Sequence, residues 1–380
     1  VTLTGPATSS NFGLSIGTGD INADGRQDLI VGASGVSSSA GQAYIYEGRD
    51  NYSWTLQNQA VGTSRISVGG VGEELAITGS ATTDYFGISI TTGDLNTDGK
   101  MDLVVSSENN VSSIGRVYVF YNDGSYSPRA DGADVVIGDT TSQRFGHKVA
   151  TGDLNADGKT DLVVGAYAYS TSTGHVYIFY NDGVYPSLAA NADVILTGET
   201  SSNYFGNSFS VGDLNADGKV DLVVGAYGYS SNAGRAYIFY ADGTSNFGTA
   251  TCSGTPAACS AANADVIITG EAATYFSVDS LATGDINADG KTDLIVGAPS
   301  YSSNAGRSYI FYNDGSIPTT AATADVIING QTSSYFGRAL AVGDLNADGK
   351  RDLVISASDY PGSGRAYIFY NDGSIPTTAA

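Results

Sequence analysis

Residues 205–240 read FGNSFSVGDLNADGKVDLVVGAYGYSSNAGRAYIFY, and the chain of 380 residues contains six copies of this stretch. In every copy a nine-residue acidic segment, here called an acidic loop, follows one apolar segment and precedes another. Counting outward from this copy, the loops begin 59 or 60 residues apart, or 72 and 74 where insertions lie within 244–263 and 48–73. Repetition with a period of about 60 residues predicts a repeat architecture. The six loops begin at Asp20, Asp94, Asp153, Asp213, Asp285 and Asp344.

Each repeat unit reads as four short strands, and in the fourth unit we expect them at 205–211, 221–225, 236–240 and 265–269. The second is a continuous apolar run, typical of a strand buried on both faces. The third is rich in aromatic and β-branched residues. No helical period of useful length appears. Four strands per unit, repeated six times, predict an all-β fold: a six-bladed β-propeller of four-stranded antiparallel blades.

The two ends of the chain look like parts of one blade. The last unit stops before a fourth strand, while residues 1–5, VTLTG, resemble a fourth strand with no unit before it. We therefore expect the N-terminal strand to complete the last blade and close the propeller, which removes exposed sheet edges. The alternative is seven blades, with six units cut from a longer array. We expect one domain over 1–380, with blades at about 6–79, 80–138, 139–197, 198–270, 271–329, and 330–380 plus 1–5.

The acidic loops share the pattern D-x-N-x-D-G-x-x-D, numbered here as positions 1 to 9. Oxygen ligands at positions 1, 3 and 5 can converge on one cation, glycine at position 6 permits a sharp turn, and position 7 can offer its backbone carbonyl. Many protein oxygens in a flexible loop favour Ca²⁺ over Mg²⁺. We predict about six calcium sites, whose ligand residues are Asp20, Asn22, Asp24, Arg26, Asp28, Asp94, Asn96, Asp98, Lys100, Asp102, Asp153, Asn155, Asp157, Lys159, Asp161, Asp213, Asn215, Asp217, Lys219, Asp221, Asp285, Asn287, Asp289, Lys291, Asp293, Asp344, Asn346, Asp348, Lys350 and Asp352.

A loop of this composition has a second interpretation, a hydrogen-bonded Asx turn that holds no ion. Six loops with three carboxylates each would repel strongly without a cation, which favours calcium. Stabilisation of the fold is the role we expect for the ions, because several weak sites together contribute as much as the whole stability of a domain.

The overall charge narrows the class of partner. The chain carries 17 basic and 39 acidic residues, a net charge of −22, which argues against nucleic acid and against anionic membrane surfaces. No apolar run approaches the roughly 20 residues that span a bilayer, so direct membrane insertion is not expected. The two cysteines, Cys252 and Cys259, are spaced for a small loop disulfide, with free thiols as the alternative; a disulfide and an acidic surface favour an extracellular location.

The motifs around the acidic loops resemble the FG-GAP repeats of the integrin α-subunit propeller and its prokaryotic surface-protein relatives. Phe-Gly precedes the loop in five units, and Gly-Ala-Pro follows it literally at 297–299. The fifth unit departs from the pattern with Phe276-Ser277. The resemblance implies a calcium-binding propeller in an extracellular or cell-surface protein, often concerned with adhesion.

A ligand face is expected opposite the acidic loops. Loops of an antiparallel blade alternate between two faces, so the acidic loops share a face with the loops between strands three and four. Tyr, Ser and Asn crowd the opposite face, a composition typical of recognition surfaces for protein or glycan. The alternative is that these tyrosines only pack between blades. The candidate ligand-binding residues are Tyr167, Tyr169, Tyr227, Tyr229, Tyr301 and Tyr360.

Three functions remain open: a surface adhesion or protein-interaction module, a lectin with repeated sugar sites, and a structural propeller of a surface layer or accessory domain of a larger secreted protein. An enzyme is not expected. The two histidines, His147 and His175, occupy non-equivalent positions with no Ser-His-Asp pattern around them. The carboxylates are mostly assigned to calcium, which leaves few for a paired-carboxylate hydrolase.

Overall fold

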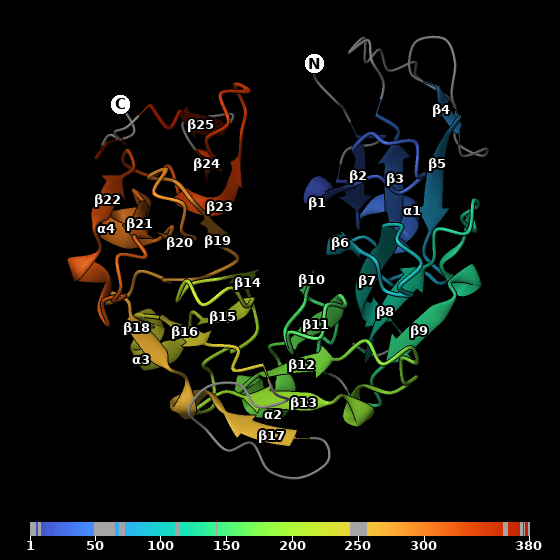
Figure 1. The fold of residues 1–380 in the computed structure, drawn as a ribbon, viewed down its shortest axis with the longest axis horizontal. Coiled ribbons are helices and arrows are strands. Elements are labelled where there is room, and N and C mark those ends of the chain that lie inside the picture. The colour runs from blue at the N-terminus through green and yellow to red at the C-terminus, as the bar shows by residue number, and fades with distance from the viewer. Residues whose placement is uncertain are drawn as a thin grey trace. The chain divides into compact units, whose positions relative to one another are not determined.

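The computed structural model describes residues 5–6, 9–48, 65–67, 73–110, 114–141, 143–243, 257–359, 364–372, 375 and 377–378. The protein is all-β, and its sheets are the blades of a six-bladed β-propeller of the predicted kind (Figure 1). The strands of blades 1 to 3 are β1 (Phe12–Gly19), β2 (Asp28–Ala33), β3 (Gln42–Tyr46), β4 (Arg65–Ser67), β5 (Glu73–Thr78), β6 (Ile90–Gly93), β7 (Asp102–Asn110), β8 (Ile114–Phe120), β9 (Val135–Gly138), β10 (Val149–Gly152), β11 (Asp161–Ala166), β12 (His175–Phe179) and β13 (Val194–Thr197). Those of blades 4 to 6 are β14 (Phe209–Gly212), β15 (Asp221–Ala226), β16 (Arg235–Phe239), β17 (Ala257–Ser260), β18 (Val266–Thr269), β19 (Leu281–Gly284), β20 (Asp293–Ala298), β21 (Arg307–Phe311), β22 (Val326–Asn329), β23 (Phe336–Gly343), β24 (Asp352–Ala357) and β25 (Arg365–Phe369).

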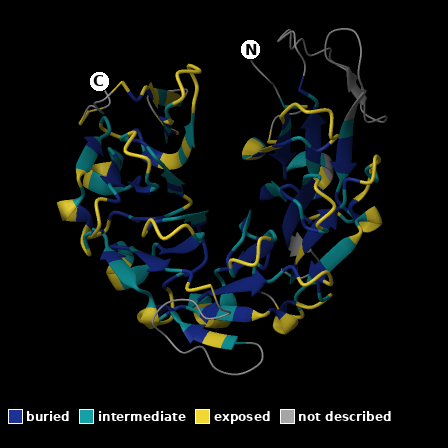
Figure 2. Ribbon diagram, in the orientation of Figure 1, coloured by how far each residue is buried: buried dark blue, intermediate teal, exposed yellow. Residues whose placement is uncertain are grey.

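Blade 4 shows how one unit is built. Its strands pair antiparallel in the order β14-β15-β16-β18, with Gly212 opposite Asp221 and Leu222 opposite Phe239. Every residue of β15 is buried, as the continuous apolar run predicted (Figure 2). The strand carries Gly225 because the next blade approaches closely: a Cβ there would lie 2.8 Å from the Ser277 carbonyl oxygen.

The first strand of blade 4 is shorter than we predicted. It begins at Phe209 instead of Phe205, after a turn in which Tyr204 and Gly206 adopt positive φ angles of 57° and 83°. The backbone turns there before it becomes extended, and glycine tolerates that conformation. The predicted strand does begin at the Phe-Gly pair in blades 1 and 6, where β1 and β23 each contain a register shift.

The helical segments are short. Among the described residues, four one-turn helices lie between the second and third strands of their blades: α1 (Val36–Ser39), α2 (Tyr169–Ser172), α3 (Tyr229–Asn232) and α4 (Tyr301–Asn304). Four 3₁₀ turns, Ala130–Gly132, Ala189–Asn191, Ala261–Asn263 and Ala321–Thr323, precede fourth strands. Within the described residues, no helix has the length and apolar character that crossing a membrane requires.

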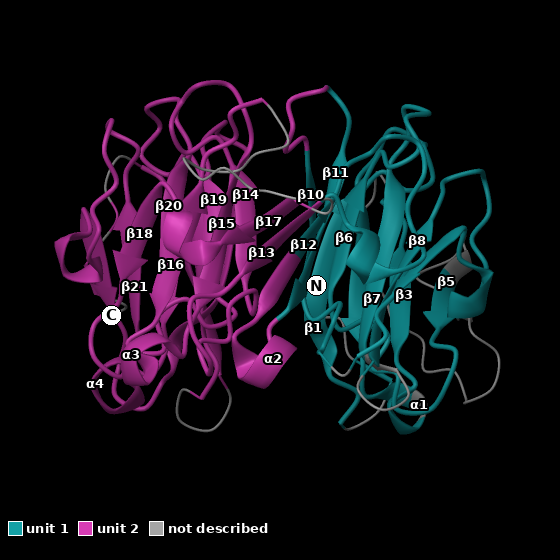
Figure 3. Cartoon of the chain, turned by 90° about the horizontal axis from the view of Figure 1, so that it is seen from below, with its two compact units in different colours: residues 1–152, 158–166, 177–193 teal, residues 153–157, 167–176, 194–380 magenta. Residues whose placement is uncertain are grey.

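Contacts group the described residues into two compact units (Figure 3). Unit 1 consists of residues 1–152, 158–166 and 177–193, and unit 2 of residues 153–157, 167–176 and 194–380. Blades 1 and 2 therefore belong to unit 1, blades 4 to 6 to unit 2, and the boundary falls within blade 3. That the chain forms one domain with the predicted blade boundaries stays a prediction.

Blades within a unit pack through aromatic and aliphatic side chains. In unit 2, one buried cluster joins Leu214 and Ile238 of blade 4 to Phe276, Tyr309 and Phe311 of blade 5. The rings of Phe276 and Tyr309 meet edge to face at 5.5 Å. Phe336 occupies the place of Phe276 in blade 6 and is fully buried. Phe276 and Phe336 therefore pack between neighbouring blades of unit 2.

The sixth sheet has three strands among the described residues, β23-β24-β25. The fourth strand that we predicted from VTLTG falls mostly on residues 1–4, which lie outside the described residues, so closure by that strand stays a prediction. The insertion that ends before residue 264 contributes β17, which pairs in parallel with β13 of blade 3.

Candidate metal centre

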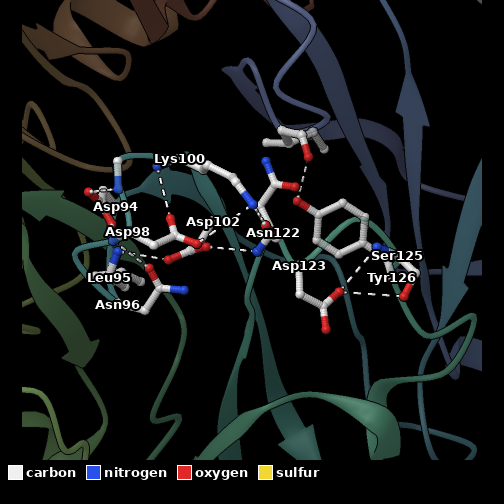
Figure 4. Close-up of polar contacts among 12 residues, drawn as sticks. Asp94, Leu95, Asn96, Asp98, Lys100, Asp102, Asn122, Asp123, Ser125 and Tyr126 are labelled. Carbon is white, nitrogen blue, oxygen red and sulfur yellow. Dashed lines mark hydrogen bonds and ion pairs between the residues drawn. The ribbon is translucent and has the colours of Figure 1, made fainter.

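The acidic loops connect the first and second strands of each blade and fold tightly on themselves. Figure 4 shows the loop between β6 and β7. Asp94 accepts hydrogen bonds at Oδ1 from the Asp98 amide (3.1 Å) and at Oδ2 from the Gly99 amide (2.9 Å). Asn96 Oδ1 also accepts from the Asp98 amide, and Asp98 Oδ1 accepts from the Lys100 amide, both at 2.9 Å. The side-chain oxygens of positions 1, 3 and 5 are thus oriented by the loop's own backbone.

The pattern repeats along the chain. The loops that begin at Asp20, Asp213, Asp285 and Asp344 contain the same four backbone-to-side-chain hydrogen bonds, at 2.8–3.1 Å. In the third loop the Asp157 amide donates to Asp153 Oδ1 and to Asn155 Oδ1, both at 3.0 Å. Glycine at position 6 has a φ angle of 82–87° in all six loops, the conformation that the sharp turn requires.

The aspartate at position 9 differs from the others because it is buried. Asp102 is 0% exposed and accepts from two amides at 2.8 Å, Leu95 within the loop and Asn122 after β8. This carboxylate therefore joins the acidic loop to the loop between the third and fourth strands, which places both loops on one face of the blade, as predicted. The position-9 aspartates of the other loops are 0–1% exposed: Asp28, Asp161, Asp221, Asp293 and Asp352.

Burial raises the pKa of four of these carboxyls, those of Asp28, Asp102, Asp221 and Asp293. The pKa of Asp221 rises to about 7 because the group is desolvated; the Ala241 and Leu214 amides oppose the rise, and the charges of Asp217 and Asp213 add to it. The same causes raise the pKa of Asp293 to about 6. Three carboxylates of one loop are thus close enough to repel one another, and a cation would relieve that repulsion.

The donor set suits a hard cation, although the oxygens bind backbone amides here. Among the described residues, no group of three or more Asp, Glu, His or Cys side chains is arranged to hold a metal ion. Carboxylate and amide oxygens at positions 1, 3, 5 and 9 are nevertheless the ligand types that Ca²⁺ takes. An oxygen that accepts one hydrogen bond keeps a second lone pair, so the loops fit calcium chemically.

Two contacts of the loops were not predicted from the sequence. The hydroxyl of Tyr126, which follows β8, donates to the Ile21 carbonyl of the first acidic loop at 2.7 Å (Figure 4). The Lys100 ammonium donates to the Asn122 carbonyl at 3.0 Å. The recurrence of Asn-Asp-Gly after the third strand was the available signal, because Asn122 binds both Asp102 and Lys100.

The candidate ligand-binding tyrosines lie at the other end of the blades, and two of them, Tyr167 and Tyr227, contact other tyrosine rings. In unit 2 the rings of Tyr167, Tyr204, Tyr227 and Tyr275 follow each other at centroid distances of 6.1, 4.6 and 5.9 Å. Tyr204 and Tyr227 are nearly parallel, at 9°. We call these four residues the tyrosine row. These ring contacts join residues of blades 3, 4 and 5, which favours the interpretation that the tyrosines pack between blades.

The remaining candidates have basic partners or lie outside the described residues. The guanidinium groups of Arg235 and Arg307 lie 3.5 Å from the ring centroids of Tyr229 and Tyr301. Tyr169 stacks on His175 at 3.4 Å. Tyr360 lies outside the described residues.

Cys259 and His147 take part in contacts within the fold. Cys259 is disulfide-bonded, which agrees with the predicted loop disulfide; Cys252 lies outside the described residues. Nδ1 of His147 lies 2.6 Å from Glu108 Oε2, and Arg144 contacts Oε1 of the same carboxylate at 2.8 Å. Burial would raise the pKa of Glu108, but the His147 and Arg144 contacts hold it below its ordinary value.

Comparison with known proteins identifies the family to which these repeats belong. The profile of the FG-GAP repeat matches six times, at residues 12–46, 86–120, 145–179, 205–239, 277–311 and 336–369. The chain belongs to the FG-GAP repeat family. Each match contains one acidic loop and ends at the third strand of its blade. The fifth FG-GAP match begins at Ser277, the unit in which Phe-Gly is replaced by Phe-Ser.

Relatives of this FG-GAP protein include integrin α subunits and one enzyme. Integrin alpha-5 of Xenopus laevis is 31% identical over 233 residues, 56% of this chain and 20% of that protein. Integrin alpha-8 of Gallus gallus is 25% identical over 252 residues, 62% and 22% of the two chains. Phosphatidylinositol-glycan-specific phospholipase D of Bos taurus is 27% identical over 296 residues, 71% and 34%. The chain spans about a third or less of the length of these relatives, and the predicted resemblance to integrin α propellers is confirmed.

Proposed function

We propose that this chain is a calcium-stabilised, extracellular or cell-surface FG-GAP propeller that acts as an adhesion or protein-interaction module without catalytic activity of its own. One observation carries the proposal: in all six acidic loops the amide at position 5 binds the side-chain oxygens of positions 1 and 3, and the aspartate at position 9 is buried. The integrin α relatives support the module, although the phospholipase relative means that family membership alone does not decide against an enzyme.

Calcium would be held by the side chains at positions 1, 3, 5 and 9 and the carbonyl of position 7. Bound there, it supplies positive charge to a loop that carries three carboxylates. If each site binds at about 0.1 mM and extracellular calcium is about 1 mM, each contributes about 1.4 kcal/mol to the free energy of unfolding. Six such sites would contribute about 8 kcal/mol, comparable to the whole stability of a domain.

The test of calcium is thermal unfolding in about 2 mM calcium and in excess chelator, with magnesium as the matched control. We expect the melting temperature to fall by more than about 10 °C in chelator and to recover with calcium but not with an equal concentration of magnesium. Identical melting curves in calcium and chelator would contradict the calcium assignment.

The test of the adhesion module is cell attachment to surfaces coated with the chain, run beside a glycan array, both in calcium and in chelator. Calcium-dependent attachment with a blank array supports a protein-binding module. Calcium-dependent binding to one sugar class would instead establish a lectin. If the folded chain neither supports cell attachment nor binds a sugar, both the protein-binding module and the lectin are contradicted. A structural propeller then remains.

The alternative function, a structural propeller that is an accessory domain of a larger protein, also has an observation in its favour. The relatives contain the matched region as a third or less of longer chains, including one named as a phospholipase. An accessory propeller of a larger protein would show the same calcium stabilisation without binding cells.

A further inference from the structure

Lysine is nearly confined to one position of the acidic loops. Position 7 is Arg26 in the first loop and lysine in the other five, and the chain contains only one further lysine, Lys148. In a chain of net charge −22 this placement brings one positive charge to each group of three loop carboxylates. The net charge of a loop thereby falls from −3 to −2, the charge that one divalent cation neutralises.

In three loops the ammonium group of the position-7 lysine donates a hydrogen bond to the loop between the third and fourth strands of its blade. We call this hydrogen bond a tie. Lys100, Lys159 and Lys219 donate to the carbonyl of the second residue after the third strand, at 3.0, 3.1 and 3.4 Å. These acceptors belong to Asn122, Asn181 and Ala241.

The residue whose carbonyl accepts from the lysine also donates its backbone amide to the position-9 aspartate. In the second blade the Asn122 amide binds Asp102, and in the fourth the Ala241 amide binds Asp221, both at 2.8 Å. One residue therefore receives the lysine with its carbonyl and holds the buried aspartate with its amide. Lys219 also lies 3.4 Å from Asp217 Oδ2 and lines a cavity of about 310 Å³ beside the loop.

We propose that the position-7 lysine is a built-in counter-cation, which holds the acidic loop folded without a divalent ion and lowers its affinity for calcium. The inference rests on the proposed calcium sites and deepens them. The ammonium reduces the repulsion among the carboxylates in the absence of calcium. The same positive charge repels calcium, so each site fills only at a higher calcium concentration.

The chain offers matched variants for the test. Lys291 and Lys350 occupy position 7 of the fifth and sixth loops, where their amides bind position 5 but no side-chain tie to the third-to-fourth-strand loop is present among the described residues. The variant Lys100→Met/Lys219→Met removes two charges and two ties. The variant Lys291→Met/Lys350→Met removes two charges and leaves all three ties.

We expect two separate effects. In chelator, Lys100→Met/Lys219→Met should melt about 2–4 °C below the unsubstituted chain, and the control pair should change less. In calcium titrations followed by calorimetry, both pairs should show about three- to tenfold tighter binding at the two altered sites, because a nearby positive charge is lost. Lys100→Arg/Lys219→Arg should keep the original calcium affinity.

Failure of the inference is distinguishable from failure of the calcium sites. Calcium binding by the unsubstituted chain, with unchanged affinity and unchanged melting in chelator for Lys100→Met/Lys219→Met, would overturn the counter-cation role alone. No calcium binding by the unsubstituted chain would overturn the proposed function. If the double variant does not fold, Lys219→Met alone gives the same comparison against Lys291→Met.

Discussion

At the scale of single residues, equivalent positions of the blades use different side chains for the same packing task. Arg235 and Arg307 stack on Tyr229 and Tyr301 and bind Glu199 and Glu271 at 2.6 and 2.7 Å. Blade 3 has His175 at this position. An arginine stays charged, whereas a histidine loses its charge within the physiological pH range. At this position, therefore, only the side chain of blade 3 can change its charge in mild acid.

His175 gives a prediction about pH. Burial lowers its pKa from 6.5 to about 4, so the unfolded chain binds a proton that the folded chain excludes between these pH values. The contribution of His175 to the free energy of unfolding is therefore fully present above pH 6.5. It is lost as the pH drops towards 4, which lowers that free energy by up to about 3 kcal/mol.

The measurement is urea unfolding at pH 7, 5.5 and 4.5 in saturating calcium for the unsubstituted chain and for His175→Gln. The difference between the two chains isolates the histidine from the loop carboxylates, which titrate in both. The unsubstituted chain should lose more stability on acidification than His175→Gln. Equal losses would show that His175 is not buried in its neutral form.

At the scale of elements, the loops opposite the acidic loops are held by ring stacking. The tyrosine row alternates between residues before the Phe-Gly pair and residues after the second strand, so it connects blades 3, 4 and 5 within unit 2. Its hydroxyls take part as well, since Asn232 donates to Tyr275 at 3.3 Å. The row therefore packs neighbouring blades against one another.

The variant Tyr227→Ala tests this role. It removes the ring between Tyr204 and Tyr275 and should cost about 2 kcal/mol, because the side chain is half-buried. Thermal unfolding is the measurement, and Tyr370→Ala, at a position 51% exposed, is the control with little expected change. If Tyr227→Ala melts normally but abolishes attachment or sugar binding, the row is a ligand site and the packing interpretation is wrong.

At the scale of the whole molecule, the first and last blades of the chain expose apolar side chains, and those of blade 6 are buried at the equivalent positions of blade 5. Leu345 and Ile368 of blade 6 are both 51% exposed, whereas the equivalent Ile286 and Ile310 of blade 5 are 1% and 0% exposed. In blade 1, Ile16 is 60% exposed. Apolar faces of this kind are normally covered in a folded protein.

A glycine series tests whether the face of blade 6 is covered in solution. A Cβ at Gly284 would lie 2.6 Å from Val342 of the next blade, whereas one at Gly343, the equivalent position of blade 6, would meet no atom within 4 Å among the described residues. Gly284→Ala should therefore cost about 1–3 kcal/mol. Gly138→Ala, whose nearest neighbour is a flexible arginine stem at 3.9 Å, is the tolerated control.

We expect Gly343→Ala to be as costly as Gly284→Ala in thermal unfolding, because the predicted closure places another blade face against this position. A melting temperature like that of Gly138→Ala would show that the face stays open. Size measurement by light scattering then distinguishes a cover within one chain from one supplied by a second copy.

The sequence by itself determined the repeat, the all-β class, the four strands of a blade and the position of every acidic loop. It could do so because strand periodicity, turn glycines and alternating oxygen ligands are local patterns that depend on neighbours within about ten residues. The buried state of Asp102 was not visible locally, since its partner Asn122 is 20 residues away. The tie of Lys100 to the same residue and the stacking of Tyr204 on Tyr227 likewise required the tertiary structure. Residues distant in the sequence become neighbours only when strands pair and blades pack, so these contacts were decided at that level.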